Sequence, residues 1–322
     1  MKAVMFVPGP DGAGVEVREV DMPRAEPGEV LVRVKAAGLN RAELAIRRGL
    51  RSGAAQPSGI EFAGEVAALG AGATRFRIGD RVMGHWRAGQ AEFVAADEDL
   101  LVPVPPRLSW VEAAAWLNVF VTAHDAIVTN AQLKPGESIM VTAASSNVGI
   151  AALQIARLLG ANPVIGSSRS PAKLEKLVSY GLQVGVEAGA RGAAIILEAT
   201  GRKGVDVMID NVGGVAFKQN LECMGVSGRM VSVGRLAGDV GELNLDLLAL
   251  NRIKLIGVTF RTRTKRERIE CVKRCANDLW VPLQEGLLSP VVHRSFPMHD
   301  IKAAHDCMEK DEHIGKLVIE IS

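Results

Sequence analysis

The sequence predicts an α/β protein with two domains, a small β-barrel and a doubly wound parallel sheet. The chain has 322 residues, and at roughly 150 residues per domain this length favours two domains over one. Up to about residue 105, short segments alternate polar and apolar residues, whereas apolar strands alternate with helical stretches from Ile139 onward. The first pattern is typical of a rolled, half-buried sheet, and the second of a parallel sheet covered on both faces.

The strongest strand signal of the first domain lies around residue 30. Val30, Val32 and Val34 share one face, while Leu31 and Arg33 take the other. Further short strands are separated by turn sequences at Pro27-Gly28, Gly70-Ala71-Gly72, Gly79-Asp80 and Pro103-Val104-Pro105-Pro106. We expect one helix to interrupt these strands, over Arg41 to Arg48.

The pattern changes after Pro106, where a helix over residues 113–128 and a turn at Pro135-Gly136 are predicted. Apolar strands follow over residues 139–143, 163–167, 183–186, 205–209 and 230–233. Residues 265–285 form a long amphipathic pattern, and 290–296, 300–308 and 316–321 return to the character of the opening segment. We therefore expect one domain over residues 1–121, completed by 287–322, and a second over 122–286.

The composition excludes several classes of protein. Lys plus Arg number 38 and Asp plus Glu 36, a net charge of +2 that disfavours nucleic acid as the main partner. The hydrophobic residues, 48% of the chain, include no uninterrupted apolar run of about 18 and are interspersed with 23% charged residues. The N-terminus enters a strand-like run without a secretory pattern, and the 4 Cys indicate reduced thiols without a disulfide framework. We expect a soluble cytoplasmic protein that lies outside the membrane.

A turn of small residues follows the strand that begins at Ile139. Ala144, Ser146 and Gly149 occupy the three glycine positions of the G-x-G-x-x-G pattern, so only the last glycine is retained. Small side chains let backbone N–H groups approach a pyrophosphate at a helix N-terminus, and no acid opposes the anion there. Taken alone, the turn also fits an ordinary buried helix start. In its context it predicts a dinucleotide site formed by Ser145, Ser146, Asn147 and Val148.

The end of the next strand predicts which dinucleotide is bound. An NAD site requires an acid there for the ribose hydroxyls, whereas a 2′-phosphate requires hydroxyls and cations. The sequence supplies Ser168, Arg169 and Lys173. The two cations also fit a solvated helix start, but cations oppose the helix dipole at that end. The segment therefore favours NADP over NAD.

Six stretches in order resemble one family over more than 300 residues. They are Ala37-Gly38-Leu39-Asn40-Arg41-Ala42-Glu43-Leu44, Gly59-Ile60-Glu61-Phe62-Ala63-Gly64-Glu65-Val66, Gly79-Asp80-Arg81-Val82, Ala143-Ala144-Ser145-Ser146-Asn147-Val148-Gly149, Asp210-Asn211-Val212-Gly213-Gly214 and His313-Ile314-Gly315-Lys316-Leu317-Val318. The chain resembles the zinc-independent, zeta-crystallin-like quinone oxidoreductases of the medium-chain dehydrogenase/reductase superfamily. The resemblance implies a GroES-like catalytic domain followed by a Rossmann NADP-binding domain.

The resemblance also implies that no zinc is bound. Zinc-dependent relatives require thiolate and imidazole ligands at the positions filled here by Asn40 and Ile60, and a third ligand near Asn118. Cys271 and Cys275 share a helix face, but no His or acid cluster accompanies them in the sequence. We expect these two thiols to be half-buried packing residues.

By resemblance, Asn40 and Thr122 are the candidate catalytic residues and also contact the nicotinamide of NADPH. Asn40 also fits a turn-forming residue, and Thr122 a helix cap. The same resemblance assigns the remaining cofactor contacts to the pyrophosphate turn, the 2′-phosphate segment and several later strand ends. Those residues are Ser145, Ser146, Asn147, Val148, Ser168, Arg169, Lys173, Asn211, Val233, Gly234, Arg235, Phe260, Arg261, Thr262 and Lys316.

The implied activity is direct hydride transfer from NADPH to a quinone or enone, without metal. Reduction of an enal, an enoyl thioester or a haloacrylate is the alternative. The loop after Asn40 reads Gly49-Leu50-Arg51-Ser52-Gly53 where relatives usually place an aromatic residue, which counts against an enoyl reductase that uses a tyrosine there. Val186-Glu187 is a second departure, because relatives often place Asn-Tyr at this point.

A role outside catalysis also has a sequence feature. The basic segment Arg261 to Arg266 fits a structural or RNA-binding role as well as a solvated loop and helix start. The family further implies a homodimer, with the apolar strand Ile253 to Phe260 pairing at its edge.

Overall fold

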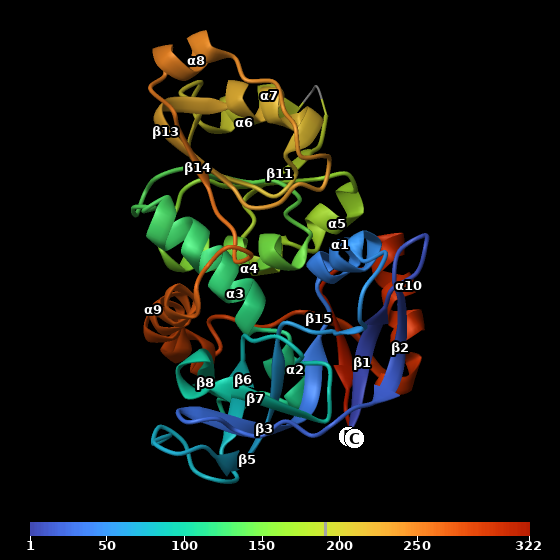
Figure 1. The fold of residues 1–322 in the computed structure, drawn as a ribbon. Coiled ribbons are helices and arrows are strands. Elements are labelled where there is room, and N and C mark those ends of the chain that lie inside the picture. Colours follow the sequence, from blue (N-terminus) through green and yellow to red (C-terminus); the bar gives the residue numbers. More distant parts are fainter. Residues whose placement is uncertain (190–191) are drawn as a thin grey trace. The chain divides into compact units, whose positions relative to one another are not determined.

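The computed structural model describes residues 1–189 and 192–322, which divide into two compact units (Figure 1). Unit 1 comprises Met1–Asn118 and Lys265–Ser322, and unit 2 comprises Val119–Thr264. Unit 1 is built on largely antiparallel sheets, with one parallel pair near the end of the chain, and unit 2 on a parallel sheet between helices. The predicted α/β fold with a barrel-like part and a doubly wound part is confirmed.

Unit 1 contains two sheets. The smaller has the order β2-β1-β4, and the larger has the order β15-β16-β3-β5-β6-β8, with β7 also paired to β3. Their strands are β1 (Lys2–Val7), β2 (Gly14–Glu19), β3 (Glu29–Gly38), β4 (Gln56–Pro57), β5 (Phe62–Leu69), β6 (Arg81–Gly84), β7 (Phe93–Asp97), β8 (Leu101–Pro103), β15 (Val292–Pro297) and β16 (Lys316–Glu320). The alternating valines of β3 are buried in the core of this unit together with Phe62 and Leu317.

The C-terminal segment of the chain completes unit 1. Strand β16, red in Figure 1, lies antiparallel to β3, with Val318 opposite Gly38. Helix α10 (Ile301–Lys310) buries Ile301, Ala304 and Met308 in the same core. Helix α1 (Arg41–Gly49) follows β3 directly. The end of the chain therefore contributes directly to the surroundings of residues near position 40.

Unit 2 is a doubly wound sheet with the strand order β11-β10-β9-β12-β13-β14, all parallel. This is the order of dinucleotide-binding folds, in which ligands bind at the carboxyl ends of the strands. The strands are β9 (Ile139–Val141), β10 (Val164–Ser168), β11 (Val184–Glu187), β12 (Val205–Asp210), β13 (Met224–Ser232) and β14 (Lys254–Gly257). The helices are α4 (Asn147–Leu158), α5 (Pro171–Glu175), α6 (Gly192–Ala199), α7 (Phe217–Glu222) and α8 (Leu245–Leu250).

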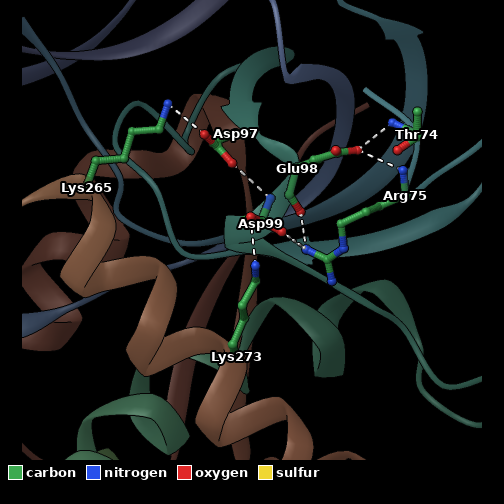
Figure 2. A network of polar contacts seen from close by, with 7 residues as sticks. All are labelled: Thr74, Arg75, Asp97, Glu98, Asp99, Lys265 and Lys273. Carbon is green, nitrogen blue, oxygen red and sulfur yellow. Dashed lines mark hydrogen bonds and ion pairs between the residues drawn. The ribbon is translucent and has the colours of Figure 1, made fainter. Parts of the chain in front are cut away.

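Helix α9 (Lys265–Gln284) belongs to unit 1, although the sequence-based boundaries assign it to the second domain. The helix packs against Glu98–Leu100 and β8 of unit 1. Ion pairs join the same elements, since Lys265 Nζ lies 2.6 Å from Asp97 and Lys273 Nζ 2.8 Å from Asp99 (Figure 2). At the other end of α9, Arg107 donates hydrogen bonds to the carbonyls of Leu283 and Leu288. The helical period marks where α9 lies, but its packing partners, which are distant in the sequence, decide which unit it joins.

Cys271 and Cys275 of α9 are buried, not half-buried as predicted. Burial raises the pKa of the Cys275 thiol well above its usual range. Both thiols therefore act as apolar packing groups.

The helix predicted over residues 113–128 is interrupted and starts earlier. Ser109 and Glu112 form a reciprocal capping box that begins α2 (Trp110–Ala114). Helix α3 (Leu117–His124) and a π-helical turn (Asp125–Asn130) follow. The whole stretch Trp110–Asn130 is long and apolar enough to cross a membrane, but 78% of its most apolar window is buried inside the protein. That burial is typical of a core helix.

Candidate functional site

Strand register brings Asn40, Glu61 and Lys316 together in unit 1. Val318 pairs with Gly38 across β16 and β3, so Lys316 at the start of β16 lies opposite Asn40 just beyond β3. Ala36 pairs with Ala63 across β3 and β5, which places Glu61 beside the end of β3. All three side chains are buried.

These residues and Asn118 form a fully connected polar group, which we call the Asn40 cluster. Lys316 Nζ lies 2.5 Å from Glu61 Oε1 and donates to Asn40 Oδ1 at 2.6 Å. Asn40 Nδ2 donates to Glu61 Oε1 at 2.9 Å, and Asn118 Nδ2 donates to Asn40 Oδ1 at 2.7 Å. The backbone N–H of Asn118 donates to Glu61 Oε2 at 3.1 Å. The Glu61 carboxylate thus accepts on both oxygens, which offsets part of its desolvation.

Gly38 makes room for the Glu61 carboxylate. A Cβ at this position would lie 2.4 Å from Glu61 Oε1 and 2.6 Å from the Ala114 carbonyl oxygen. Both contacts are shorter than van der Waals separation, so a larger residue would displace the carboxylate. The glycine of the Ala37-Gly38-Leu39-Asn40 motif is therefore needed for close approach.

A second carboxyl group, Glu43, lies beside the Asn40 cluster on α1. Gln90 Nε2 donates to Glu43 Oε2 at 3.0 Å, while Asn40 Nδ2 lies 3.5 Å from Glu43 Oε1. Burial raises the pKa of Glu43 to about 8, although Lys316 and these hydrogen bonds lower it in part. Glu43 is therefore protonated at neutral pH, whereas Glu61 pairs with Lys316.

The donor set of the Asn40 cluster differs from that of a transition-metal site. Asn40 and Asn118 hydrogen-bond to each other, Ile60 is half-buried, and an ammonium group contacts Asn40. Among residues 1–189 and 192–322, no group of three or more His, Cys, Asp or Glu side chains is arranged to hold a metal ion. The cluster consists of two carboxamides, an ammonium and one carboxylate that is paired with the ammonium, whereas zinc prefers thiolates and imidazoles.

The predicted contacts of Asn40 and Lys316 with a cofactor stay predictions. In the structure, both ends of the Asn40 amide are bonded within the cluster, and Lys316 is 1% exposed. Thr122, the other candidate catalytic residue, is half-buried in α3 of unit 2.

In unit 2, the turn after β9 forms the N-terminus of α4. Ser146 is the N-cap residue, and its Oγ accepts a hydrogen bond from the Gly149 N–H. A Cβ on Gly149 would lie 2.6 Å from the Ala143 carbonyl oxygen, so the turn can close tightly only with glycine there. The first turn of α4 has no acid, and Ser145, Asn147 and Val148 are partly exposed. These features fit the pyrophosphate of a dinucleotide.

The ends of β9 and β10 meet at this turn. Ser145 Oγ and Ser168 Oγ lie 3.3 Å apart, and the Ser170 N–H donates to Ser168 Oγ. Arg169 follows β10 with an exposed side chain, and Lys173 lies in α5. The fold thus places the predicted 2′-phosphate residues and the pyrophosphate turn on neighbouring segments, as a single dinucleotide would require.

Asp210 organises the carboxyl ends of the central strands. Its Oδ1 accepts from Thr142 Oγ1 at 2.9 Å and from the Val212 N–H at 3.1 Å. Asn211 is buried and donates from Nδ2 to the Thr142 carbonyl at 2.8 Å. The Val233 and Gly234 N–H groups donate to the Asp210 carbonyl. Asn211, Val233 and Gly234 therefore lie at the carboxyl edge where they were expected.

The remaining predicted cofactor residues lie in loops of unit 2. Arg235 is exposed directly after Gly234. Phe260, Arg261 and Thr262 follow β14, and Phe260 stacks under the Arg263 guanidinium, 4.8 Å from the ring centroid.

Several polar residues of the two units were not predicted from the sequence. Glu43 and Glu61 lie in two of the resembling stretches, but the sequence predicted no function for them. It predicted none for Gln90, Thr142 or Asp210 either. A usable signal for Glu61 was present, because an ionisable residue directly before an apolar strand must find a partner if it is buried.

Replacing Glu43 by Gln should remove a pH dependence from the free energy of unfolding. The folded protein holds the Glu43 proton up to about pH 8, whereas the unfolded chain releases it near pH 4.5, the ordinary value for a glutamic acid. Between these values the folded state binds one more proton, so stability falls as pH rises by about 1.4 kcal/mol per pH unit. In urea unfolding, the difference between the wild-type and Glu43→Gln stabilities should show this slope from pH 5 to about pH 8 and level off above it.

Two buried histidines also make stability depend on pH, so the quantity to compare is the difference in unfolding free energy between wild type and Glu43→Gln. Burial lowers the pKa of His85 and of His305 to about 4, and these groups make stability rise with pH below about 6.5. Subtracting the two curves cancels that contribution. Glu19→Gln, at an exposed position, is the control and should leave the slope unchanged. Parallel curves for wild type and Glu43→Gln would show that Glu43 is ionised in the folded protein.

Lys316→Met should destabilise the protein strongly, because it leaves the Glu61 carboxylate buried without its counter-charge. The expected loss is about 3–5 kcal/mol in the free energy of unfolding, measured by denaturant titration. The double variant Glu61→Gln/Lys316→Met should recover a large part of that loss. A cost below about 1 kcal/mol for the single variant would mean that the pair is not desolvated.

Two family descriptions match the chain, one in each half. Residues 26–106 match the alcohol dehydrogenase GroES-like domain, and residues 147–277 match the zinc-binding dehydrogenase family.

The curated relatives include both single enzymes and parts of larger ones. A quinone oxidoreductase of Pseudomonas aeruginosa is 31% identical over 320 residues, covering 95% of this chain and 96% of the relative. Polyketide synthase GfsB of Streptomyces halstedii is 30% identical over 299 residues, and a phenolphthiocerol/phthiocerol polyketide synthase subunit of Mycobacterium tuberculosis is 30% identical over 312. These two matches include 92% and 95% of this chain, but the chain spans only 5% and 14% of the length of the two synthases.

Solved structures agree in fold over the whole chain. A Pseudomonas syringae quinone oxidoreductase is 28% identical with a TM-score of 0.87 and 99% coverage of both chains. A mycobacterial protein solved in complex with NADPH is 24% identical with a TM-score of 0.89 and 100% coverage of both chains, a likeness of fold alone. With the near-complete match to the Pseudomonas aeruginosa enzyme, these findings show that the chain belongs to the quinone oxidoreductase branch of the medium-chain dehydrogenase/reductase superfamily.

Proposed function

We propose that this protein is a zinc-independent reductase that uses NADPH to reduce quinones or related enones by direct hydride transfer. The observation that carries the proposal is the donor set of the Asn40 cluster. Two carboxamides and an isoleucine occupy the positions that the resemblance assigns to zinc ligands, and the adjacent cation is Lys316. An ammonium has no lone pair for a metal. Without a metal to polarise the substrate, the hydride acceptor must already be electrophilic, as a quinone or an enone is.

Unit 2 supports the cofactor assignment through the turn after β9. The N–H groups and small side chains of Ser145, Ser146, Asn147 and Val148 would hold the pyrophosphate. Ser168, Arg169 and Lys173 would hold the 2′-phosphate through hydroxyl and charge-assisted hydrogen bonds. When bound, a reduced nicotinamide supplies the hydride equivalent.

Within unit 1, the Asn40 cluster would act by fixed positioning. Hydrogen bonds to both ends of the Asn40 amide prevent it from rotating, and the Glu61–Lys316 pair balances charge within the cluster. A rigid, charge-balanced wall holds reacting groups in a reactive orientation without reorganising.

The chemistry of a quinone acceptor removes the need for a strong protein acid. The oxyanion that develops on a quinone is delocalised over its ring, so solvent can protonate it. Glu43 is 1% exposed, and we assign it no proton-donor role.

A second candidate is the reduction of another activated alkene, such as an enoyl thioester. The similarity to segments of polyketide synthases favours it. Against it, the loop from Gly49 to Gly53 lacks an aromatic residue, and Tyr180 lies in unit 2 after α5. An RNA-binding role for residues 261–266 is less well supported, because Arg263 and Lys265 are engaged by Asp125 and Asp97.

We further propose a cytoplasmic homodimer. Strand β14 lies at the edge of the sheet with exposed Lys254 and Leu255, and an edge strand of this kind can pair with a second copy. The predicted segment Ile253 to Phe260 contains this strand.

The activity is tested by following NADPH oxidation with quinones, enones, enals and saturated aldehydes after exhaustive treatment with EDTA. We expect turnover with quinones and enones at the rate of the untreated protein, and none with saturated aldehydes. Loss of activity on chelation with recovery on adding Zn²⁺ would contradict the metal-free mechanism. Turnover confined to enoyl thioesters would select the second candidate.

Arg169→Ala should weaken NADPH binding by at least about 10-fold, because a charged hydrogen bond to phosphate contributes roughly 1.5–3 kcal/mol. NADH binding should change by no more than about 2-fold, since NADH has no 2′-phosphate. Both affinities can be measured by quenching of tryptophan fluorescence. Arg157→Ala, an exposed site in the last turn of α4, is the control. Equal losses for both coenzymes would remove Arg169 from the 2′-phosphate site.

A further inference from the structure

A basic hollow lies in unit 2, where the paired segments of strands β13 and β14 begin. Its volume is about 390 Å³, and it is lined by Gln132, Lys134, Ser227, Arg229, Arg252 and Lys254. Ser227 and Arg229 lie in the middle of β13, and Arg229 and Lys254 begin the segments over which β13 and β14 pair. In a parallel sheet this edge is opposite the carboxyl edge that carries Asn211 and Val233. We call it the amino-edge hollow.

The lining of the amino-edge hollow is cationic and contains no acidic side chain among the described residues. Arg229 is neutralised by Glu137, which it contacts through both terminal nitrogens at 3.1 and 2.5 Å. Arg252 donates to Ser227 Oγ at 3.4 Å. Within the described part of the chain, no ion pair engages Lys134, Arg252 or Lys254. Three positive charges are therefore uncompensated around one hollow.

Strand register sets two of these cations against each other. Arg229 is the direct partner of Lys254 across β13 and β14. Like charges at directly opposed positions in a sheet are destabilising. Glu137 offsets the charge on Arg229 but leaves Lys254 and Arg252 on the same side without a counter-charge. A bound anion would remove this repulsion.

The rim of the hollow is held in an unusual backbone conformation. Gln132, Ser227 and Arg252 have φ values of 52°, 62° and 48°, in the left-handed region. For non-glycine residues this conformation costs on the order of 1–2 kcal/mol each, and such residues cluster at binding sites. Here three of them surround the same hollow.

We propose that the amino-edge hollow binds a small phosphorylated ligand of the diphosphate class. The roughly three negative charges of a diphosphate match the uncompensated charges of Lys134, Arg252 and Lys254. The planar Arg252 guanidinium suits two phosphate oxygens, whereas each lysine contributes a point charge. The proposal is independent of the reductase activity, because the hollow shares no residue with the Asn40 cluster or the turn after β9.

The test is a calorimetric titration of the full chain with inorganic diphosphate at low and physiological ionic strength. We expect binding by wild type that weakens with salt. Binding should fall by at least about 10-fold in Arg252→Glu/Lys254→Glu. The matched control Lys176→Glu/Lys302→Glu reverses two exposed charges outside the hollow, one in each unit, and should bind as wild type does. Arg169→Ala should also retain binding, which separates the hollow from the predicted 2′-phosphate site.

A milder variant and a measurement of Tm distinguish loss of binding from loss of the fold. Lys254→Gln should bind diphosphate more weakly than wild type with an unchanged Tm. Diphosphate should raise the Tm of wild type and leave that of Arg252→Glu/Lys254→Glu unaltered.

Four results would overturn the proposal. The first is equal affinity in Arg252→Glu/Lys254→Glu and its control, and the second is loss of binding in Arg169→Ala alone. The third is binding of an oligoribonucleotide without binding of diphosphate. The fourth combines two observations: wild type does not bind diphosphate, and Arg252→Glu/Lys254→Glu changes the oligomeric state. That result would mean that a second copy of the chain binds at the hollow.

Discussion

The buried ion pair between Glu61 and Lys316 is the interaction on which the organisation of unit 1 depends. Two charges removed from water are tolerated only when they neutralise each other and their remaining hydrogen-bonding capacity is met. Here that requirement joins the end of β3, the start of β5, the start of β16 and the first turn of α3 at one point. Gly38 supplies the space and the amides of Asn40 and Asn118 supply the remaining partners, so removing one charge alone leaves the other buried without its counter-charge.

The two edges of the parallel sheet in unit 2 differ in their charged and polar groups. At the carboxyl edge, Asp210 ties β9 to β12 and the N-terminus of α4 exposes backbone donors. At the amino edge, Lys254 and Arg252 add charge beside Arg229. Parallel strands place all their carboxyl ends on one side, so the predicted dinucleotide site and the proposed diphosphate site lie at opposite edges of the sheet.

The order and type of elements followed from local sequence, but the grouping of elements did not. The apolar segments from Ile139 to Val233 correctly predicted the parallel strands, because a fully buried strand has a nearly continuous apolar sequence. The pattern of residues 265–285 correctly predicted a helix. Its place in unit 1 depends on contacts with residues 98–100 and β8 and on the polar partners Asp97, Asp99 and Arg107, which periodicity does not reveal. The helix predicted over residues 113–128 was wrong in its continuity, since the Ser109 cap begins an earlier, shorter helix.

By itself, the sequence determined the fold class, the small-residue turn from Ala143 to Gly149 and the family, because these depend on residue types at short spacing. The family resemblance also predicts that Asn40, Ile60 and Asn118 stand where zinc-dependent relatives have metal ligands. Only the tertiary structure decided that Asn40 and Asn118 bond to each other and to Lys316, that Glu43 is buried and protonated, and that Lys134, Arg252 and Lys254 line one hollow. Register and burial bring together residues that are far apart along the chain, and no local pattern contains that information.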